Sequence, residues 1–240
     1  MRLEENPRKA EEGHAPYASF TVAGETLLLL AARAVYWPRE KMLIVADIHF
    51  GKAASFRALG VPVPHGTTAE NLGALDQLLA VHDVGHIVFL GDFLHARTAR
   101  APATMARICD WRQRHAGVRL TLIRGNHDTH AGDPPAELAI DAVDEPALFG
   151  PFALCHHPDV PLDRLPRLAS SAPAYVLAGH VHPVYHLRSR RDTLRLPCFL
   201  AGPARLLLPS FGAFTGGFPV TAEADEAVFL TTGDDIFALS

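Results

Sequence analysis

Five apolar segments of this chain share an unusual feature, because each of them ends abruptly in side chains that can bind a metal ion. The segment that ends at Ile123, for example, is followed within a few residues by an amide, an imidazole and a carboxylate. A buried strand more often ends in a simple turn or a helix cap. The five endings are D-I-H at 47–49, G-D at 91–92, G-N-H-D at 125–128, H-H at 156–157 and G-H-V-H at 179–182.

Strand-like and helix-like segments alternate between the first three of these endings. Residues 42–46 predict a buried strand. In residues 67–83 the leucines follow helical spacing, with Thr67 or Thr68 as the expected N-cap, and a second helix is predicted for residues 103–115. This alternation predicts a sheet covered by helices, with its functional site at the carboxyl ends of the strands.

The two ends of the chain contain little helical periodicity. Residues 17–30 predict two short strands about a glycine-containing turn, and the region after residue 187 is strand-like. We therefore predict an α/β fold in which two sheets pack as a sandwich flanked by helices. No change in composition marks a linker, so residues 17–240 are expected to form one domain after a flexible polar tail at 1–16.

Composition excludes several classes of protein. The net charge of −4 gives no global basic field that would attract nucleic acid or anionic lipid. Three scattered cysteines cannot form a disulfide scaffold, which suits a reducing cytosol. The sequence contains no secretory signal and no segment long enough to span a bilayer. A cytoplasmic protein without membrane contact is expected.

The residue types at the five endings favour divalent metal ions. Carboxylate oxygens, imidazole nitrogens and an amide oxygen, without thiolate, suit Mn²⁺, Fe²⁺ or Zn²⁺. One metal would leave several of these groups unused, whereas two metals roughly 3.5–4 Å apart can share one carboxylate and promote displacement at phosphorus. Two dications and the two carboxylates Asp47 and Asp92 leave a net charge of about +2, which would attract a phosphate.

Each ending is weak evidence on its own. A D-x-H or H-x-H pair occurs by chance in many proteins, and a histidine after an apolar run is more often a buried residue with ordinary hydrogen bonds. All five endings occur in this order, each at the end of a predicted strand, and chance is then a poor explanation.

Between residues 43 and 183 the series D-x-H, G-D, G-N-H-D, H and G-H-x-H resembles the calcineurin-like metallophosphoesterase superfamily. The resemblance implies an αββα sandwich of two mixed β-sheets flanked by helices. It also implies two divalent ions, with Asp92 bridging them and sharing a hydroxide nucleophile between them. The first ion would be held by Asp47, His49, Asp92 and His182, and the second by Asp92, Asn126, His156 and His180.

The same resemblance assigns catalytic roles outside the metal ligands. His127 would contact the phosphate and assist the leaving group, with Asp128 as the partner that orients it. His95 stands where the superfamily usually has Asp in G-D-x-x-D, and this variant resembles the double-strand-break repair nucleases, in which it touches the substrate phosphate. The fourth motif usually reads H-G. Here the chain has two adjacent histidines, so two candidates for the ligand remain. His156 directly follows FALC and is preferred, and His157 is the alternative.

Two further segments, YWPREKMLIVADIHFGKAASFRALGVPVPHGTT and PSFGAFTGG, resemble the ligase-associated bacterial metallophosphoesterases. That subgroup is encoded beside an ATP-dependent DNA ligase and a DEXH-type helicase in apparent DNA-repair operons. The resemblance implies a Mn²⁺-dependent phosphodiesterase that acts on DNA as an endonuclease or end-processing nuclease on single strands. It also implies a functional association with that ligase and helicase.

Basic residues near the motifs are candidate phosphate contacts. From His95 to Arg124 the chain has seven arginines and a single acid, and Arg107, Arg112 and Arg114 are expected on a solvated helix face. The candidate substrate-binding residues are those closest to the motifs, Arg97, Arg100, Lys52 and Arg57. Such a local basic track on an acidic protein predicts weak, salt-sensitive DNA binding.

Other functions fit the same metal centre. A phosphatase or a 2′,3′-cyclic nucleotide phosphodiesterase is the main alternative, because the metal ligands do not define the leaving group. Lipid-precursor pyrophosphatases, which resemble G-N-R-D at the third motif, fit less well, since this chain has His127. A binding protein with a dead site is disfavoured by the complete ligand set. The sequence leaves open whether His65 caps a helix or contacts substrate.

Overall fold

The computed structural model describes residues 15–63, 66–160, 174–189 and 192–239. Most of the predicted tail, and also His65, lie outside these residues. The last two residues of the predicted tail are part of the fold. Ala15 donates its amide to the Asp235 carboxylate, and the Pro16 carbonyl accepts the Ala31 amide.

The first sheet contains seven strands that follow one another in sequence order. Its first four strands pair antiparallel, and its last four, from β4 onward, pair parallel. The strands are β1 (Tyr17–Val22), β2 (Glu25–Leu30), β3 (Ala34–Trp37), β4 (Met42–Ala46), β5 (His86–Leu90), β6 (Arg119–Ile123) and β7 (Ile140–Val143).

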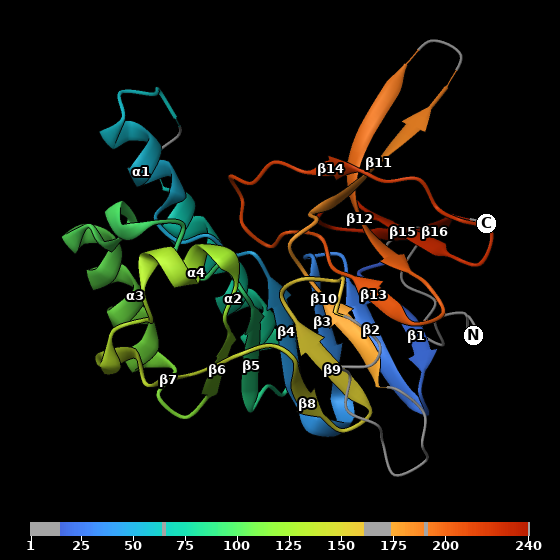
Figure 1. The fold of residues 1–240 in the computed structure, drawn as a ribbon, viewed down its shortest axis with the longest axis horizontal. Coiled ribbons are helices and arrows are strands. Elements are labelled where there is room, and N and C mark those ends of the chain that lie inside the picture. Colours follow the sequence, from blue (N-terminus) through green and yellow to red (C-terminus); the bar gives the residue numbers. More distant parts are fainter. Residues whose placement is uncertain (1–14, 64–65, 161–173, 190–191, 240) are drawn as a thin grey trace.

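The second sheet contains nine strands from the later part of the chain. The long strand β12 pairs with β11 through its outer half and with β13 and β15 through its inner half. The β11–β12 ribbon projects beyond the rest of the sheet (Figure 1). The strands are β8 (Ala147–Phe149), β9 (Phe152–Cys155), β10 (Tyr175–Ala178), β11 (Pro183–Arg188), β12 (Thr193–Ala201), β13 (Arg205–Leu207), β14 (Phe218–Pro219), β15 (Ala227–Thr231) and β16 (Ile236–Leu239).

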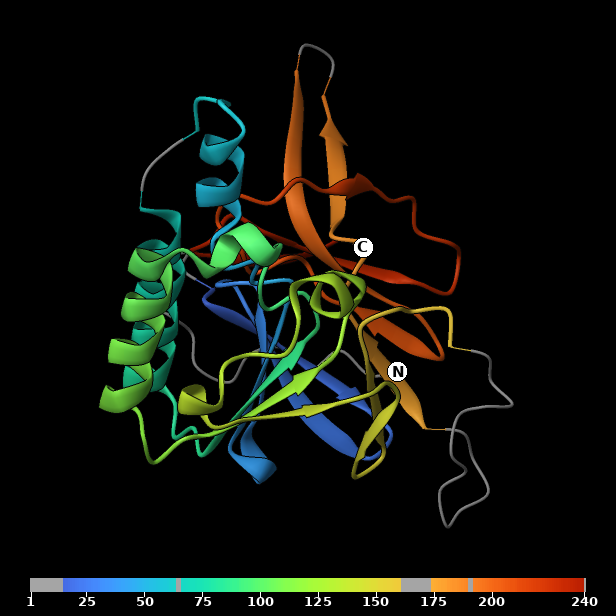
Figure 2. The same ribbon diagram turned by 60° about the vertical axis from the view of Figure 1, so that its left-hand side comes forward.

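The helices of the described residues all come from the part of the chain that forms the first sheet. The two longest of these helices cover the side of that sheet that faces away from the second sheet (Figures 1 and 2). None of the described helices is long and apolar enough to cross a membrane. The α-helices are α1 (Lys52–Ala58), α2 (Thr67–Val81), α3 (Pro102–Arg114) and α4 (Asn126–Ala131), and the short 3-10 helices are η1 (Pro38–Glu40), η2 (Arg97–Arg100) and η3 (Ala136–Leu138).

The core lies in layers, and strand β4 shows why. Its five residues are all buried because helices cover one of its faces and the second sheet covers the other. Leu43 and Val45 belong to the apolar cluster under the helices, whereas Ile44 and Ala46 belong to the cluster between the sheets. The continuous apolar run in the sequence is therefore the pattern of a strand buried on both sides. The predicted two-sheet sandwich is confirmed.

One local prediction was wrong. Helix α2 begins as expected at Thr67, but its N-cap is Gly66, with φ of 93° and no side-chain hydrogen bond to the first turn. The Thr68 hydroxyl oxygen instead lies 3.4 Å from the amide nitrogen of Gly51. This contact ties α2 to the start of α1. Thr68, which was predicted as a possible local cap, therefore makes a tertiary contact instead.

Phe152 tests the packing between the sheets. Its fully buried ring lies edge-on against Trp37 of the first sheet and also contacts Tyr175. Phe152→Ala should lower the free energy of unfolding by about 3–5 kcal/mol, because it removes a large buried ring and leaves a cavity. Urea denaturation measures this loss. Phe237→Ala, at a ring that is 47% exposed, is the control and should cost less than about 0.5 kcal/mol. Equal losses for both variants would contradict this account of the core.

Candidate metal centre and active site

The predicted site residues meet where strands of both sheets end. Ala46, Leu90 and Ile123, the last residues of β4, β5 and β6, are register partners in the first sheet. Cys155 and Ala178, which end β9 and β10, are register partners in the second. Each predicted metal ligand follows one of these strand ends by one to four residues. In-register parallel pairing therefore brings the side chains to the seam between the sheets.

A first cluster is formed by Asp47, His49 and His182, whose ligand atoms all lie within 4.8 Å of one another. Asp47 Oδ1 lies 3.2 Å from His182 Nε2. His49 Nε2 lies 3.7 Å from Asp92 Oδ2, so Asp92 borders this cluster. Asp47, His49 and Asp92 are almost fully buried, and the His182 ring is partly exposed. This is the group of four that was predicted for the first metal ion.

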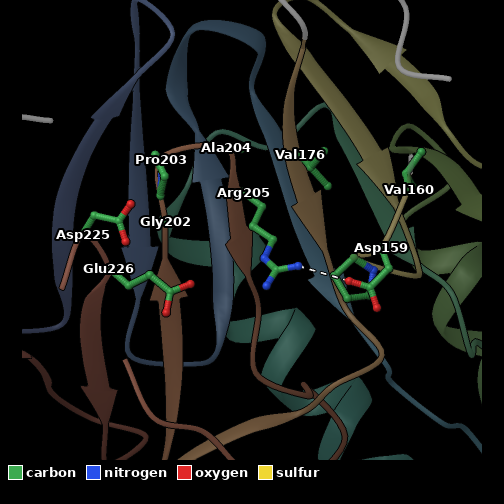
Figure 3. Close-up of a pocket in the computed structure, with 10 residues that line it drawn as sticks. Asp159, Val160, Val176, Gly202, Pro203, Ala204, Arg205, Asp225 and Glu226 are labelled. Carbon is green, nitrogen blue, oxygen red and sulfur yellow. Dashed lines mark hydrogen bonds and ion pairs between the residues drawn. The ribbon is translucent and has the colours of Figure 1, made fainter. Parts of the chain in front are cut away.

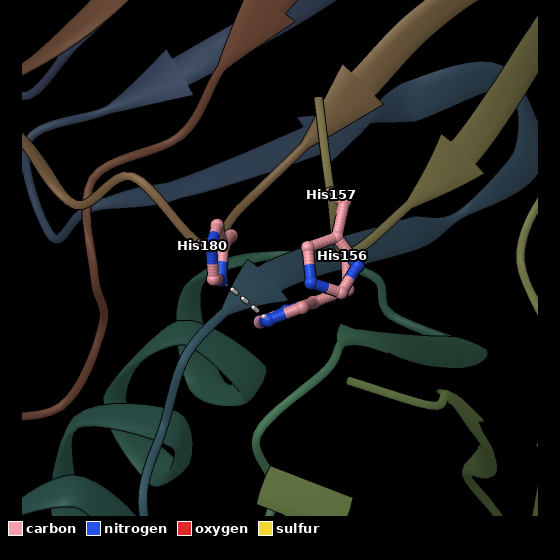
Figure 4. Close-up of side chains that lie close together, drawn as sticks. All are labelled: His156, His157 and His180. Carbon is pink, nitrogen blue, oxygen red and sulfur yellow. Dashed lines mark hydrogen bonds between the residues drawn. The ribbon is translucent and has the colours of Figure 1, made fainter. Parts of the chain in front are cut away.

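A second cluster surrounds Nε2 of the fully buried His156. This atom lies 2.8 Å from Asn126 Oδ1, 3.0 Å from His180 Nδ1 and 3.6 Å from Asp92 Oδ1. Figure 4 shows His156 and His180 meeting at this point. The two oxygens of Asp92 therefore face different clusters, which is the arrangement that a shared carboxylate requires.

The hydrogen bonds of His156 indicate that a cation fits the second cluster. Its Nδ1 lies 3.1 Å from the Leu90 carbonyl oxygen, which can only accept a hydrogen bond, so Nδ1 carries the proton. In the neutral ring Nε2 then has only a lone pair, and it faces the amide oxygen of Asn126. A positive ion between these atoms would satisfy both lone pairs.

Polar atoms without a hydrogen-bond partner point to the same place. Six buried side-chain polar atoms of the described residues lack a partner, and five of them belong to Asp47, His49, His95 and His182. Buried polar groups are normally hydrogen-bonded, so a concentration of exceptions requires an explanation. Metal coordination would explain the unpaired oxygen of Asp47 and one unpaired ring nitrogen each of His49 and His182.

Burial also keeps histidines of the centre neutral. Desolvation lowers the pKa of His49 far below its ordinary value, and the positive charge of Lys52 acts in the same direction. Desolvation also lowers the pKa of His180, helped by repulsion from His156. A neutral imidazole has a free lone pair, which is the form that binds metal.

The backbone is strained at the predicted ligands. Five of them have positive φ angles between 48° and 67°, a region that residues other than glycine rarely adopt. Strain of this kind costs of order 1–3 kcal/mol per residue and concentrates at functional sites. The five residues are Asp47, His49, Asp92, His180 and His182.

A family model described as the calcineurin-like phosphoesterase superfamily domain matches residues 41–202. This match contains every predicted metal ligand and is longer than half of the chain. The chain belongs to this superfamily. It is therefore a metal-dependent phosphoesterase, as the series of strand-end motifs predicted.

One solved structure agrees with this assignment. The nuclease MPE of Pseudomonas putida is 47% identical to this chain, with 93% of this chain and 100% of that chain covered and a TM-score of 0.78. A conserved uncharacterised protein of Streptococcus pneumoniae TIGR4, described as a predicted phosphoesterase, is 16% identical, with 83% and 88% covered and a TM-score of 0.31. A search of curated proteins found no match. The family model and the first structure confirm the predicted fold.

Three glycines of the phosphoesterase motifs are required by close approach. A Cβ atom at Gly91 would lie 2.1 Å from His156 Nδ1, and one at Gly125 would lie 2.5 Å from Asp92 Oδ1. At Gly179 it would lie 2.6 Å from Asp47 Oδ2. Each glycine thus leaves space for a ligand delivered by another strand. In the sequence these glycines appear only as parts of the motifs, and nothing there indicates this role.

His127 lies beside the metal clusters, but the residue predicted to orient it does not do so. Its Nδ1 lies 2.7 Å from the His95 carbonyl oxygen and must donate to it. Asp128 is occupied elsewhere, because its carboxylate accepts the backbone amides of Asp92, Phe93 and Gly125. The expected contact with the His127 ring was therefore wrong. Asp128 instead holds the strand end that carries Asp92.

His95 lies in a stack of rings that leads away from the clusters. Its ring is stacked on His127 at 4.9 Å and on Phe56 of α1 at 5.8 Å between ring centroids. Burial lowers the pKa of His95 to about 4, and the charge of Lys52 contributes. Its Nδ1 is buried without a partner in the described part of the chain. A neutral His95 can offer a hydrogen bond at this place.

The four basic residues predicted to bind substrate have different surroundings. Lys52 interacts electrostatically with Asp47 and Asp92, although desolvation lowers its pKa. Arg57 lines a separate cavity of about 270 Å³ at the start of α2. Arg97 donates through Nε to the His130 carbonyl, and Arg100 donates to the carbonyls of Ala131 and Asp133. The last two therefore tie η2 to α4, a structural role that the sequence did not indicate.

One further residue differs from expectation. Arg112 was expected on a solvated helix face, but its guanidinium donates to the carbonyls of His115, Val118 and Leu138, which fixes the end of α3.

A cavity of about 510 Å³ opens elsewhere on the second sheet, bounded by Asp159, Val176, Arg205 and Glu226 (Figure 3). Arg205 forms an ion pair with Asp159 across it at 3.2 Å. None of the residues that line this cavity belongs to the predicted site. Its presence does not change the assignment of the active centre to the strand ends.

A substitution at Gly91 tests the geometry of the centre. Gly91→Ala should abolish binding of the second metal, because φ is +75° and the new methyl group would overlap the His156 ring. Metal content by mass spectrometry, together with thermal unfolding of the metal-free protein, measures the effect. Gly73→Ala is the matched control, since nothing lies within 4 Å of its Cβ position and alanine favours the helix. Normal metal content in Gly91→Ala would refute the proposed position of His156.

Proposed function

We propose that this phosphoesterase hydrolyses phosphodiester bonds in DNA, acting as an endonuclease or end-processing nuclease on single strands with two Mn²⁺ ions. The observation that carries the proposal is the position of His127, whose ring is fixed by the His95 carbonyl with Nε2 3.9 Å from Asp92 Oδ2. An imidazole held beside a shared carboxylate suits a reaction that must protonate a poor leaving group. The identity of 47% with a bacterial nuclease supports nucleic acid as the substrate.

The two groups of ligands would hold the metal ions around a shared carboxylate. When bound, such ions act as Lewis acids on a phosphoryl oxygen and lower the pKa of a coordinated water. The clustering of lone pairs around Asp92 and the neutral state of His49 and His180 support this assignment. The first set is Asp47, His49, Asp92 and His182, and the second is Asp92, Asn126, His156 and His180.

His127 would supply the proton for the leaving group. Because Nδ1–H donates to a carbonyl, only Nε2 of His127 can act on substrate, and it gives up a proton from the imidazolium form. A deoxyribose alkoxide is a poor leaving group and needs such a donor, which is typically worth about 10²–10⁴-fold in rate. A phenolate leaving group needs far less help.

His95 and Lys52 would position the phosphate. The neutral His95 ring is held between Phe56 and His127, so it can offer a hydrogen bond without rearrangement. Lys52 begins α1 and is coupled to both buried carboxylates, so it adds positive charge beside the centre. Arg57 can contact the chain of the substrate further along α1. The structural bonds of Arg97 and Arg100 make these two residues weaker candidates.

We further propose that the enzyme acts in DNA repair, in functional association with an ATP-dependent DNA ligase and a DEXH-type helicase. The support is the resemblance of residues 36–68 and 209–217 to the ligase-associated subgroup. Cleavage of a labelled single-stranded oligonucleotide with Mn²⁺, with the product ends identified, tests the substrate. Turnover of phosphomonoesters or 2′,3′-cyclic nucleotides without cleavage of DNA would favour the phosphatase or cyclic phosphodiesterase alternative.

Asp92 tests the two-metal site. Asp92→Ala should abolish turnover of every substrate, because its two oxygens face the two clusters and both ions would lose a ligand. Metal analysis and turnover of bis-(p-nitrophenyl) phosphate are measured together. A fully active wild-type chain that carries one ion or fewer would overturn the binuclear assignment.

Alanine variants of His127 and His95 should distinguish leaving-group chemistry from phosphate positioning. His127→Ala should reduce kcat/KM for DNA more than for bis-(p-nitrophenyl) phosphate, since the phenolate needs little protonation. His95→Ala should reduce both values to a similar degree, because it keeps the backbone carbonyl that orients His127.

Metal content should stay normal in both variants. His115→Ala, which alters a histidine directly after α3 that is paired with Asp76, is the control and should change neither rate. Equal losses on the two substrates in His127→Ala would remove its assignment as a general acid.

A further inference from the structure

Glu145 makes an unusual set of hydrogen bonds beside the second cluster. It lies in the turn between β7 of the first sheet and β8 of the second. One carboxylate oxygen accepts the backbone amides of His156 and His157, at 2.7 and 2.8 Å. The other lies 2.6 Å from His157 Nδ1. Glu145 thus holds both the backbone and a side chain of the pair that follows β9.

The hydrogen bond to His157 determines which of its ring nitrogens can act. With Nδ1–H donating to the carboxylate, only Nε2 carries a lone pair. A histidine that donates one N–H to a carboxylate and presents its other nitrogen is the usual arrangement at protein metal sites, where the carboxylate fixes the ring and raises its basicity. His157 is oriented in this way although it belongs to neither of the two preferred ligand sets.

The position of His157 places its ring near the ligands predicted for the second metal ion. Its ring centroid lies 4.5 Å from that of His180 and 4.7 Å from that of His156. Ligand atoms of the three histidines all lie within 4.8 Å of one another. Figure 4 shows the three rings gathered at one point.

The charges around His157 also indicate a cation at this place. The two predicted ligand sets contain two buried carboxylates, Asp47 and Asp92. Glu145 adds a third negative charge behind His157, on a side chain that is only 24% exposed. A carboxylate in this position would stabilise a cation held by the three histidines.

We propose that His157 is an additional ligand of the second metal ion through Nε2, and that Glu145 is the positioning residue that directs it there. The inference rests on the two-metal site of the proposed function. It assigns His156 and His157 to the same ion, whereas the sequence alone presents them as alternatives. The fourth motif then contributes two adjacent donors instead of one.

The test is metal affinity of the whole chain, measured by calorimetric titration of the metal-free protein with Mn²⁺. Wild type should bind two ions. His157→Ala should weaken the second site at least tenfold and leave the first unchanged. Glu145→Gln should weaken the same site by about 10–100-fold, the usual effect of removing a carboxylate behind a metal-binding histidine. The double variant should bind the second ion no more weakly than His157→Ala alone, since both changes remove one interaction.

His115→Ala is the matched control, because it removes a histidine that is also paired with a carboxylate, Asp76, but lies outside the clusters. It should leave both sites unchanged. Thermal unfolding of each metal-free variant checks that folding is intact. His157→Gln serves as a second test if the alanine variant is unstable. The visible spectrum of the cobalt-loaded protein should change in His157→Ala, since it reports the number and type of donors.

The outcomes separate the two proposals. If wild type binds two ions and His157→Ala binds both with unchanged affinity and spectrum, His157 is not a ligand and only this inference fails. If wild type binds one ion or none, the proposed two-metal site fails first. A loss at the second site in the His157 variants together with normal binding in His115→Ala supports the inference.

Discussion

The structure depends on two buried carboxylates that require a positive charge. Asp47 and Asp92 are 1% and 2% exposed, and their ion pairs within the described residues are with histidines. Isolated buried charges cost several kcal/mol. Backbone amides of His180 and His127 offset part of this cost. Because burial keeps His49 neutral and desolvation also lowers the pKa of His180, metal ions are the natural source of the missing positive charge.

This requirement explains features that would otherwise weaken the fold. Five ligands adopt strained φ angles, and five buried polar atoms at the centre lack partners. The layered core supports this strain, since apolar clusters lie on both faces of the strands that carry the ligands. The Asp128 carboxylate contributes by binding three backbone amides at the strand ends, where it holds Asp92 in its strained conformation.

Much of the fold and of the predicted ligand set could be read from the sequence, because the signals are local. The strand that ends at Ile123, for instance, is an apolar run followed at once by its functional side chains. Helix α2 follows from the spacing of its leucines. Parallel pairing then brings together strand ends that are distant in sequence. This step could be inferred from the predicted alternation of strands and helices.

The features that the sequence did not reveal depend on contacts between distant segments. Thr68 is drawn to the amide of Gly51 instead of capping its own helix, and Arg100 binds carbonyls 31 and 33 residues away. Glu145 contacts a pair of histidines 11 and 12 residues later, across the turn from one sheet to the other. No periodicity or motif marks such contacts, because they exist only once both sheets have formed.

The position of the centre at the seam makes its geometry sensitive to how the two sheets dock. The first sheet supplies Asp47, Asp92 and Asn126, and the second supplies His156 and His180, so each predicted metal site needs both sheets. The docking is fixed beside the ligands themselves. The Asp47 carbonyl accepts the Ser210 hydroxyl, and its carboxylate accepts the His180 amide. One residue thus joins the sheets and contributes to the centre, so metal binding and the packing of the sheets should be energetically coupled.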